Sequence, residues 1–323
     1  MKNKNSIKIN WFLVAILILF VILPGGIFIK LVSSEINSYL ITMIRYGLVV
    51  LVTLPFIIRA FMNKKQRKLL IKKMPIIVIM TIITCVSGPF HTAAIGLSSV
   101  SFIEIINLSA PIIFTIISIL VTKDKISHYA VVGFLFTVLG GIVIAVLPSL
   151  LGVNRAISSF GWQPLVLQVV AMIFGAVWTI YLRKMNESGL TIAPLLGIGF
   201  FGSFLVSIPL AITNGGGVEV FSEIKNLSIT SWLMIFYLAI AITIVARIVK
   251  TKAYEKIGTV SIASLDYLYH FMAIILPIII LGDTISWELI VGVILIIVGI
   301  ILTRKHTRKK KLFKSSKKRF IFK

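Results

Sequence analysis

One apolar stretch of the sequence, SFIEIINLSAP, carries polar groups at a regular spacing. Ser101, Glu104, Asn107 and Pro111 follow the intervals i, i+3, i+6 and i+10, which place them on one face of an α-helix. A carboxylate beside a carboxamide can bind an amine or another cation, hold a proton, or hydrogen-bond a polar solute. The alternative is that Glu104 lies near the outer end of its helix and extends its side chain to water.

A second stretch, SLDYLYHF, repeats this chemistry far along the chain. Asp266, Tyr269 and His270 stand at i, i+3 and i+4, so one helical face is expected to present all three. Tyr267 adds a ring that can stack on a flat solute. The alternative for Asp266 is an ion pair or a hydrogen bond to a neighbouring helix.

Two further polar residues interrupt apolar runs. Arg45 is expected either to pair with Glu104 or to bind the carboxylate of a substrate, and His91 either lines a solute path or makes a hydrogen bond between helices. Arg247 and Lys250 are expected to extend toward the membrane surface. The predicted substrate-binding residues are Glu104, Asn107, Asp266, Tyr267, Tyr269, His270, Arg45 and His91.

The composition indicates which environment must hold these residues. The chain has 323 residues, of which 58% are hydrophobic and 13% charged, with a mean hydropathy of +1.06. A soluble domain carries about 25% charged residues. No soluble core can bury so much apolar sequence, so the surrounding solvent is predicted to be lipid. The single cysteine and four scattered histidines give no disulfide or metal-ligand spacing, and no cofactor is expected.

Apolar runs long enough to cross the bilayer as helices recur ten times. The sequence therefore predicts an all-α polytopic membrane protein with spans near 11–31, 37–60, 75–96, 100–122, 129–149, 163–183, 191–213, 231–249, 260–281 and 286–303. The first run is longer than the apolar part of a signal peptide and is read as a span. The motif GIGFFG falls inside a span without a preceding strand, so small residues for close helix approach explain it better than a dinucleotide site. Pro89, Pro111 and Pro277 are expected to kink their helices.

The distribution of positive charge predicts the orientation. With both termini in the cytoplasm, 29 of the 33 Lys and Arg residues lie on the inside, including eleven in the C-terminal tail. The net charge of +23 is thus mainly a topology signal, and no nucleic-acid partner is expected. The tail can additionally attract anionic lipid.

The sequence also contains signs of an internal repeat. AIGLSSVS and AYEKIGTVS stand at matching places in two sets of five predicted helices. Because five is odd, two similar halves in tandem must lie upside down relative to each other, an arrangement typical of transporters. The expected units are a first repeat at 1–150, a second repeat at 151–303 and a basic cytoplasmic tail at 304–323.

Longer motifs resemble the EamA-type drug/metabolite transporters. They are YLITMIRYGLVVLV, AIGLSSVSFIEIINLSAPIIFTIISILVTKDKIS and AYEKIGTVSIASLDYLYHFMAIILPIIILGDTISWELIVGVILIIVGIIL. The family's arginine of the second helix falls on Arg45, and its proline 13 residues before an acid falls on Pro111 and Asp124. In the ninth helix, Leu268-Tyr269-His270 replaces the usual Leu-Glu-Pro before Asp283. The resemblance implies a ten-helix transporter of small organic molecules.

Together these features predict a secondary transporter that moves a small organic metabolite, such as an amino-acid-like or nucleoside-like solute, by alternating access. A flippase for lipid-linked or lysolipid substrates is the alternative, and an intramembrane enzyme is a third class without a matching constellation of catalytic residues. The expected setting is the inner membrane of a bacterium, with the protein as monomer or homodimer.

Overall fold

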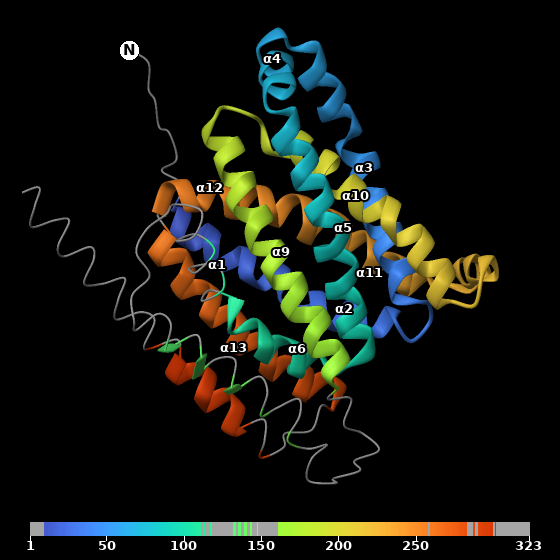
Figure 1. The fold of residues 1–323 in the computed structure, drawn as a ribbon, viewed down its shortest axis with the longest axis vertical. Helices are drawn as coiled ribbons and strands as arrows, with labels where there is room; N and C mark the ends of the chain where they lie inside the picture. The colour runs from blue at the N-terminus through green and yellow to red at the C-terminus, as the bar shows by residue number, and fades with distance from the viewer. Residues whose placement is uncertain are drawn as a thin grey trace, which may run out of the picture.

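The computed structural model describes residues 10–110, 161–257 and 259–282, with separate positions between 113 and 147 and between 287 and 301. The side chains of residues 254–268 and of Phe271 are not among those described. The described chain forms helices and no strand (Figure 1). Its elements are α1 (Trp11–Ile22), α2 (Gly25–Val32), α3 (Ser38–Met62), α4 (Lys64–Lys72), α5 (Met74–Leu97), α6 (Val100–Asn107), α9 (Trp162–Glu187), α10 (Ile192–Asn214), η1 (Val218–Asn226), α11 (Ile229–Tyr237), η2 (Leu238–Ala246), α12 (Arg247–Ile257) and α13 (Thr259–Leu281).

Six helical stretches of the described chain are long and apolar enough to cross a membrane: Trp11–Val32, Ser38–Met62, Met74–Leu97, Trp162–Glu187, Ile192–Asn214 and Ile229–Ala253. They coincide with the first, second, third, sixth, seventh and eighth predicted spans. The ninth corresponds to α13. Much of the fourth and fifth predicted spans lies outside the described residues, as do Pro111, Asp124 and Asp283. Within the tenth predicted span, Ile290–Gly299 is a short apolar helix.

Three of the predicted runs are not uniform α-helices. The first bends at Leu23 and Pro24, because proline has no amide hydrogen to continue the ladder. The fourth breaks at Leu108 and Ser109, where the Ser109 hydroxyl donates to the Ile106 carbonyl oxygen at 2.5 Å. The eighth passes through a π-helix, η2, between α11 and α12.

Helices from the first half of the chain pack against helices from the second half (Figure 1). The pairs are α3 with α10, α5 with α9, and α6 with α13, while α1 lies along α12. Another contact links the fifth and tenth predicted spans, where a Cβ added to Gly140 would lie 2.6 Å from the Gly292 carbonyl oxygen. The two halves therefore share one apolar interior.

The glycines of the GIGFFG segment lie where α10 packs closely against neighbouring helices. A Cβ added at Gly197 would lie 2.1 Å from the Thr53 hydroxyl of α3, and one at Gly202 would lie 2.2 Å from the Thr81 carbonyl oxygen of α5. A Cβ added at Gly199 would lie 3.2 Å from the Trp178 Nε1 atom of α9. These glycines let α10 approach three helices closely, which confirms the packing interpretation of the motif.

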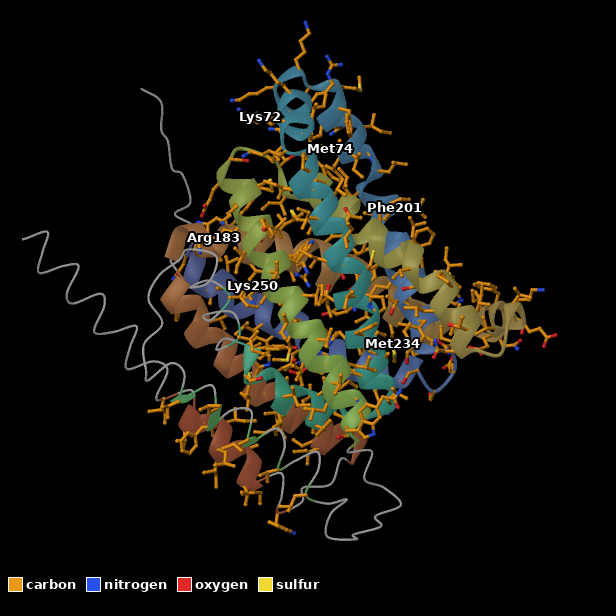
Figure 2. The ribbon with its side chains drawn as sticks, viewed as in Figure 1. Lys72, Met74, Arg183, Phe201, Met234 and Lys250 are labelled. Carbon is orange, nitrogen blue, oxygen red and sulfur yellow. The ribbon has the colours of Figure 1, made fainter. Side chains whose placement is uncertain are left out.

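Contacts between connecting segments tie the two ends of the bundle. At one end, Gln66 of α4 donates to the Gly189 carbonyl oxygen at 2.9 Å. Figure 2 shows Lys72 of α4 at this tip among outward-pointing charged side chains. At another, Glu35 accepts hydrogen bonds from Ser228 and Ser231, and Glu223 accepts from the Asn37 amide at 2.7 Å. Segments predicted on the same side of the membrane are thus joined to each other.

Candidate solute-binding site

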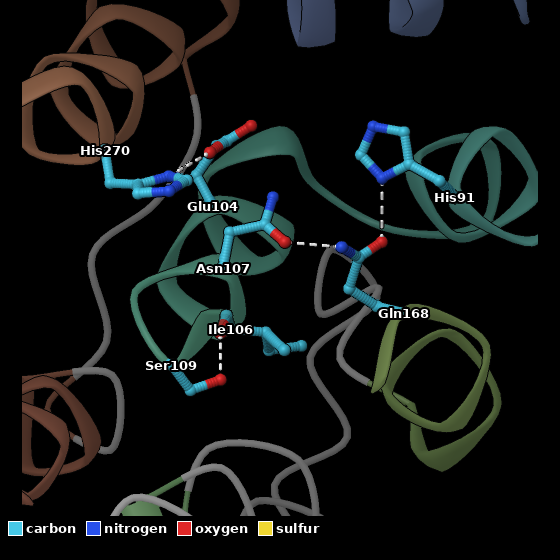
Figure 3. A network of polar contacts seen from close by, with 7 residues as sticks. All are labelled: His91, Glu104, Ile106, Asn107, Ser109, Gln168 and His270. Atoms are coloured by element: carbon cyan, nitrogen blue, oxygen red, sulfur yellow. Dashed lines mark hydrogen bonds and ion pairs between the residues drawn. The ribbon is translucent and has the colours of Figure 1, made fainter. Parts of the chain in front are cut away.

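Glu104 lies inside the bundle and is paired. Its carboxylate is on α6, the residue is only 3% exposed, and its Oε2 atom lies 3.0 Å from Nδ1 of His270 on α13 (Figure 3). The alternative in which Glu104 extends to water is therefore wrong. The reason is the packing of α6 against α13, α9, α2 and α5, which buries every residue of α6, while α13 offers the imidazole as a partner.

Asn107, one turn further along α6, belongs to a second set of contacts (Figure 3). The Gln168 side chain on α9 donates through Nε2 to the Asn107 Oδ1 atom. The Oε1 atom of Gln168 lies 2.9 Å from Nδ1 of His91 on α5. The carboxamide of Gln168 thus bridges two predicted site residues that lie on different helices.

Gln168 is the site residue that the sequence did not reveal. It is 2% exposed on a helix that is otherwise apolar around it. The available signal was weak: a buried carboxamide must find partners, but a lone Gln carries no spacing that names them. His91 makes the hydrogen bond between helices that was one of its two expected roles.

Local interactions hold α6 in place. The Ser99 hydroxyl caps its first turn by accepting from the Phe102 amide at 3.2 Å. The Ser101 hydroxyl donates to the Ile274 carbonyl oxygen of α13 at 3.2 Å. The break after Asn107 leaves its side chain at the last turn of a short helix, facing α9. This short, well-anchored element positions both Glu104 and Asn107.

Arg45 is buried on α3 and contacts the π-helix. It is 7% exposed, and its Nε and Nη2 atoms donate to the Thr243 hydroxyl at 3.1 and 2.9 Å. The Thr243 hydroxyl in turn donates to the Leu238 carbonyl oxygen at 2.8 Å. The expected ion pair between Arg45 and Glu104 is therefore wrong, because Glu104 faces α13 while Arg45 faces η2.

Arg247 also turns inward. Its guanidinium carbon lies 4.8 Å from the centre of the Trp178 ring and 5.4 Å from that of Phe200. The expectation that it extends to the membrane surface is wrong. The π-helix directly before Arg247 holds an extra residue per turn, which rotates the following side chains about the helix axis.

The remaining predicted residues lie on α13. Tyr269 packs near Ala15 and Leu19 of α1, and its ring centre lies 4.9 Å from that of His270. Asp266 and Tyr267 belong to the part of α13 whose side chains are outside the described residues. Among the described residues, no group of three or more His, Cys, Asp or Glu side chains is placed to hold a metal ion.

The arrangement is a polar interior in a lipid-embedded bundle. A single charge at bilayer depth costs about 2.5–3.5 kcal/mol on insertion scales, so buried charged groups usually serve a solute path or a partner. Glu104 and Asn107 lie one turn apart on α6, so the Glu104–His270 pair adjoins the set formed by Asn107, Gln168 and His91. Such an interior can bind and orient a small polar molecule.

Known proteins resemble this chain at three levels. Residues 162–305 match the EamA-like transporter family. An uncharacterized transporter of Clostridium kluyveri is 25% identical over 202 residues, a match that spans 61% of this chain and 61% of the relative's length. A crystal structure of a protein with 17% identity covers 92% of this chain and 98% of its own, with a TM-score of 0.56, and supports the fold alone. The resemblance to EamA-type transporters is therefore confirmed, and residues 162–305 carry the EamA-like domain of this multi-pass membrane protein.

Proposed function

We propose that the protein is a secondary transporter that moves a small organic metabolite across the cytoplasmic membrane by alternating access. The observation that carries this proposal is a pair of adjoining polar clusters on four helices, Glu104 with His270 and Asn107 with Gln168 and His91. Two of these helices come from each half of the chain. A site shared between halves changes its access when the halves move against each other.

The packing of the helices supports an inverted repeat. A rotation that exchanges the two sets of five helices maps the second onto the seventh, the fourth onto the ninth and the fifth onto the tenth. Each of these helices contacts its counterpart in the described structure. The same rotation maps the contact of the third with the sixth helix onto that of the eighth with the first, and both contacts occur.

The backbone of the bundle is interrupted where transporters need it to move. The break at Leu108 follows Asn107 directly, and the π-helix holds Thr243 beneath Arg45. Irregular backbone at membrane depth is tolerated where it is enclosed by protein or lines a path for solute.

Uptake and efflux in proteoliposomes tests the proposal. A library of amino acids, nucleosides and related metabolites is presented with and without a pH gradient. Glu104→Gln removes the buried carboxylate, while Glu187→Gln changes an exposed carboxylate on α9 and is the matched control. Asp266→Asn tests the second predicted carboxylate.

The expected result is saturable movement of at least one solute, lost in Glu104→Gln and retained in Glu187→Gln. Equal transport by Glu104→Gln, Asp266→Asn and the parent would contradict the proposed site. A fluorescent lysolipid serves as an additional probe. If the lysolipid moves between leaflets and no solute is transported, the protein is a flippase and the proposed transporter function is wrong.

A further inference from the structure

Two arginines inside the bundle lack a carboxylate partner among the described residues. The described ion pairs join Arg183 to Glu187 and His270 to Glu104, and neither includes Arg45 or Arg247. Arg45 bonds to a neutral hydroxyl through two of its nitrogens, and the Arg247 guanidinium rests on aromatic faces. The described contacts thus leave N–H donors on both guanidinium groups unused and supply neither with a carboxylate.

A pair of stacked rings lies next to both guanidinium groups. Tyr46 of α3 and Phe200 of α10 stack with their centres 4.5 Å apart and an angle of 6° between the planes. Arg45 lies 5.3 Å from the Tyr46 ring centre, and Arg247 lies 5.4 Å from that of Phe200. The Arg45 guanidinium thus contacts one ring of the stack, and that of Arg247 contacts the other.

Among the described side chains, no carboxylate neutralises these two positive charges. Like charges that repel each other in a low-dielectric interior are stabilised when an anion is placed between or beside them. The only buried carboxylate among the described side chains, that of Glu104, is engaged by His270. Planar guanidinium groups match the geometry of carboxylate and phosphate oxygens and can bind them with two parallel hydrogen bonds.

From this geometry we infer that Arg45 and Arg247 form the anion-binding part of the transport site, and that the substrate is a small organic anion bearing a carboxylate or phosphate. The inference rests on the proposed transporter function and specifies its substrate class. Thr243 positions Arg45, because its hydroxyl holds two of the guanidinium nitrogens. Trp178 and Phe200 position Arg247 through their ring faces.

The experiment compares three probes that share an indole ring and carry short side chains of different charge: indole-3-acetate, its neutral amide indole-3-acetamide, and the cation tryptamine. Binding to the full chain in nanodiscs is measured by the shift in thermal unfolding temperature as each probe is titrated. Phenyl phosphate and lysophosphatidate form two further arms, which separate a soluble phosphate from a lipid headgroup. Uptake of the same soluble probes is measured in proteoliposomes.

The expected result is at least tenfold tighter binding of indole-3-acetate than of the neutral amide. Arg45→Gln and Arg247→Gln should each weaken binding of the anion about tenfold without changing that of the amide, whereas Arg45→Lys and Arg247→Lys should keep part of the preference. Arg59→Gln, an exposed arginine on the same helix as Arg45, should bind like the parent. The unliganded unfolding temperature of each variant shows whether it folds.

Equal affinity for the anion and the amide, or an equal loss of both in the variants, overturns the inference and leaves the arginines a structural role. Binding of lysophosphatidate but not of phenyl phosphate or indole-3-acetate also overturns it, in favour of a lipid. If the protein transports only neutral or cationic solutes, the anion site fails while the transporter function stands. If the charge preference holds but no solute crosses, the transporter function fails and the anion site stands.

Discussion

At the scale of single residues, the polar side chains of the candidate site have hydrogen-bond partners that the sequence only partly predicts. Glu104 and Asn107 share a helical face, as their spacing indicates, but they meet different helices: His270 on α13 and Gln168 on α9. Spacing predicts which residues point the same way within one helix. It carries no information about which neighbouring helix each of them faces, and this is why the predicted Arg45–Glu104 pair was wrong.

Removing one member of the Glu104–His270 pair should cost more than removing both. His270→Ala leaves the buried carboxylate without its partner, and such losses lower the free energy of unfolding by about 3–5 kcal/mol. Adding Glu104→Gln to His270→Ala should recover much of this loss because no carboxylate then remains to be compensated. Thermal unfolding in nanodiscs measures the effect. A double variant no more stable than His270→Ala alone would show that the pair contributes nothing as a unit.

Gln168 should be as sensitive as the residues that the sequence identified. Gln168→Ala removes the partner of both His91 and Asn107, and each polar group left unsatisfied costs about 1–3 kcal/mol. Gln163, an exposed glutamine on the same helix, provides the control through Gln163→Ala. The unfolding temperatures of the two alanine variants test the prediction, and equal temperatures would contradict it.

At the scale of elements, hydropathy predicted the helices well and their interruptions poorly. Six predicted spans coincide with helices long enough to cross the membrane, because an apolar run in lipid has to satisfy its own backbone hydrogen bonds. The π-helix at Leu238–Ala246 has no comparable signal, since LAIAITIVA reads as an ordinary apolar helix. Its presence is explained only by the partners it meets, Arg45 through Thr243 and the rings that receive Arg247.

Glycine substitutions should separate close helix contacts from open positions. Gly202→Ala places a methyl group 2.2 Å from the Thr81 carbonyl oxygen of α5, so α10 must shift, and overpacking of this kind costs about 1–3 kcal/mol. Gly175→Ala on α9 meets nothing within 4 Å and should stabilise its helix by up to about 1 kcal/mol. Unfolding temperatures that move in opposite directions are expected. Loss of stability in Gly175→Ala, or none in Gly202→Ala, would contradict this packing.

At the scale of the whole molecule, the halves are joined through the interior and again where their connecting segments meet. Glu35, between α2 and α3, accepts hydrogen bonds from the Ser228 amide and from the hydroxyls of Ser231 and Ser228. These bonds, led by that from the Ser228 backbone, lower the pKa of Glu35 below its ordinary value. The bonds thus favour the ionised carboxylate, and the joint they make depends on pH.

The sign of this dependence follows from the lowered pKa. The stabilisation by Glu35 is fully present above the ordinary carboxyl pKa, about 4.3 in an unfolded chain, and is lost as the pH falls through the lower pKa of the folded state. The parent should therefore lose its stability advantage over Glu35→Gln as the pH falls below about 4.3. Unfolding temperatures measured from neutral to acidic pH test this, and an advantage that is constant or grows on acidification would contradict it.

The architecture as a whole was predictable in outline because charge and hydropathy act over the entire chain. The apolar runs predict an all-helical membrane protein, and the described residues form helices of which six are long and apolar enough to span. The ten spans in two inverted halves, predicted from the number of runs and the positive charge on alternate connections, stay a prediction. The interior of the site was less predictable, since it depends on which faces of neighbouring helices meet.

The most direct test of the central proposal is the ratio of proteoliposome uptake rates in Glu104→Gln and Glu187→Gln for a solute that the parent transports. Both substitutions replace a carboxylate by a carboxamide, one buried within the network and one exposed on α9. We predict that uptake falls at least tenfold in Glu104→Gln and stays at the parent rate in Glu187→Gln. Equal rates in the two variants would contradict a transport site built around Glu104.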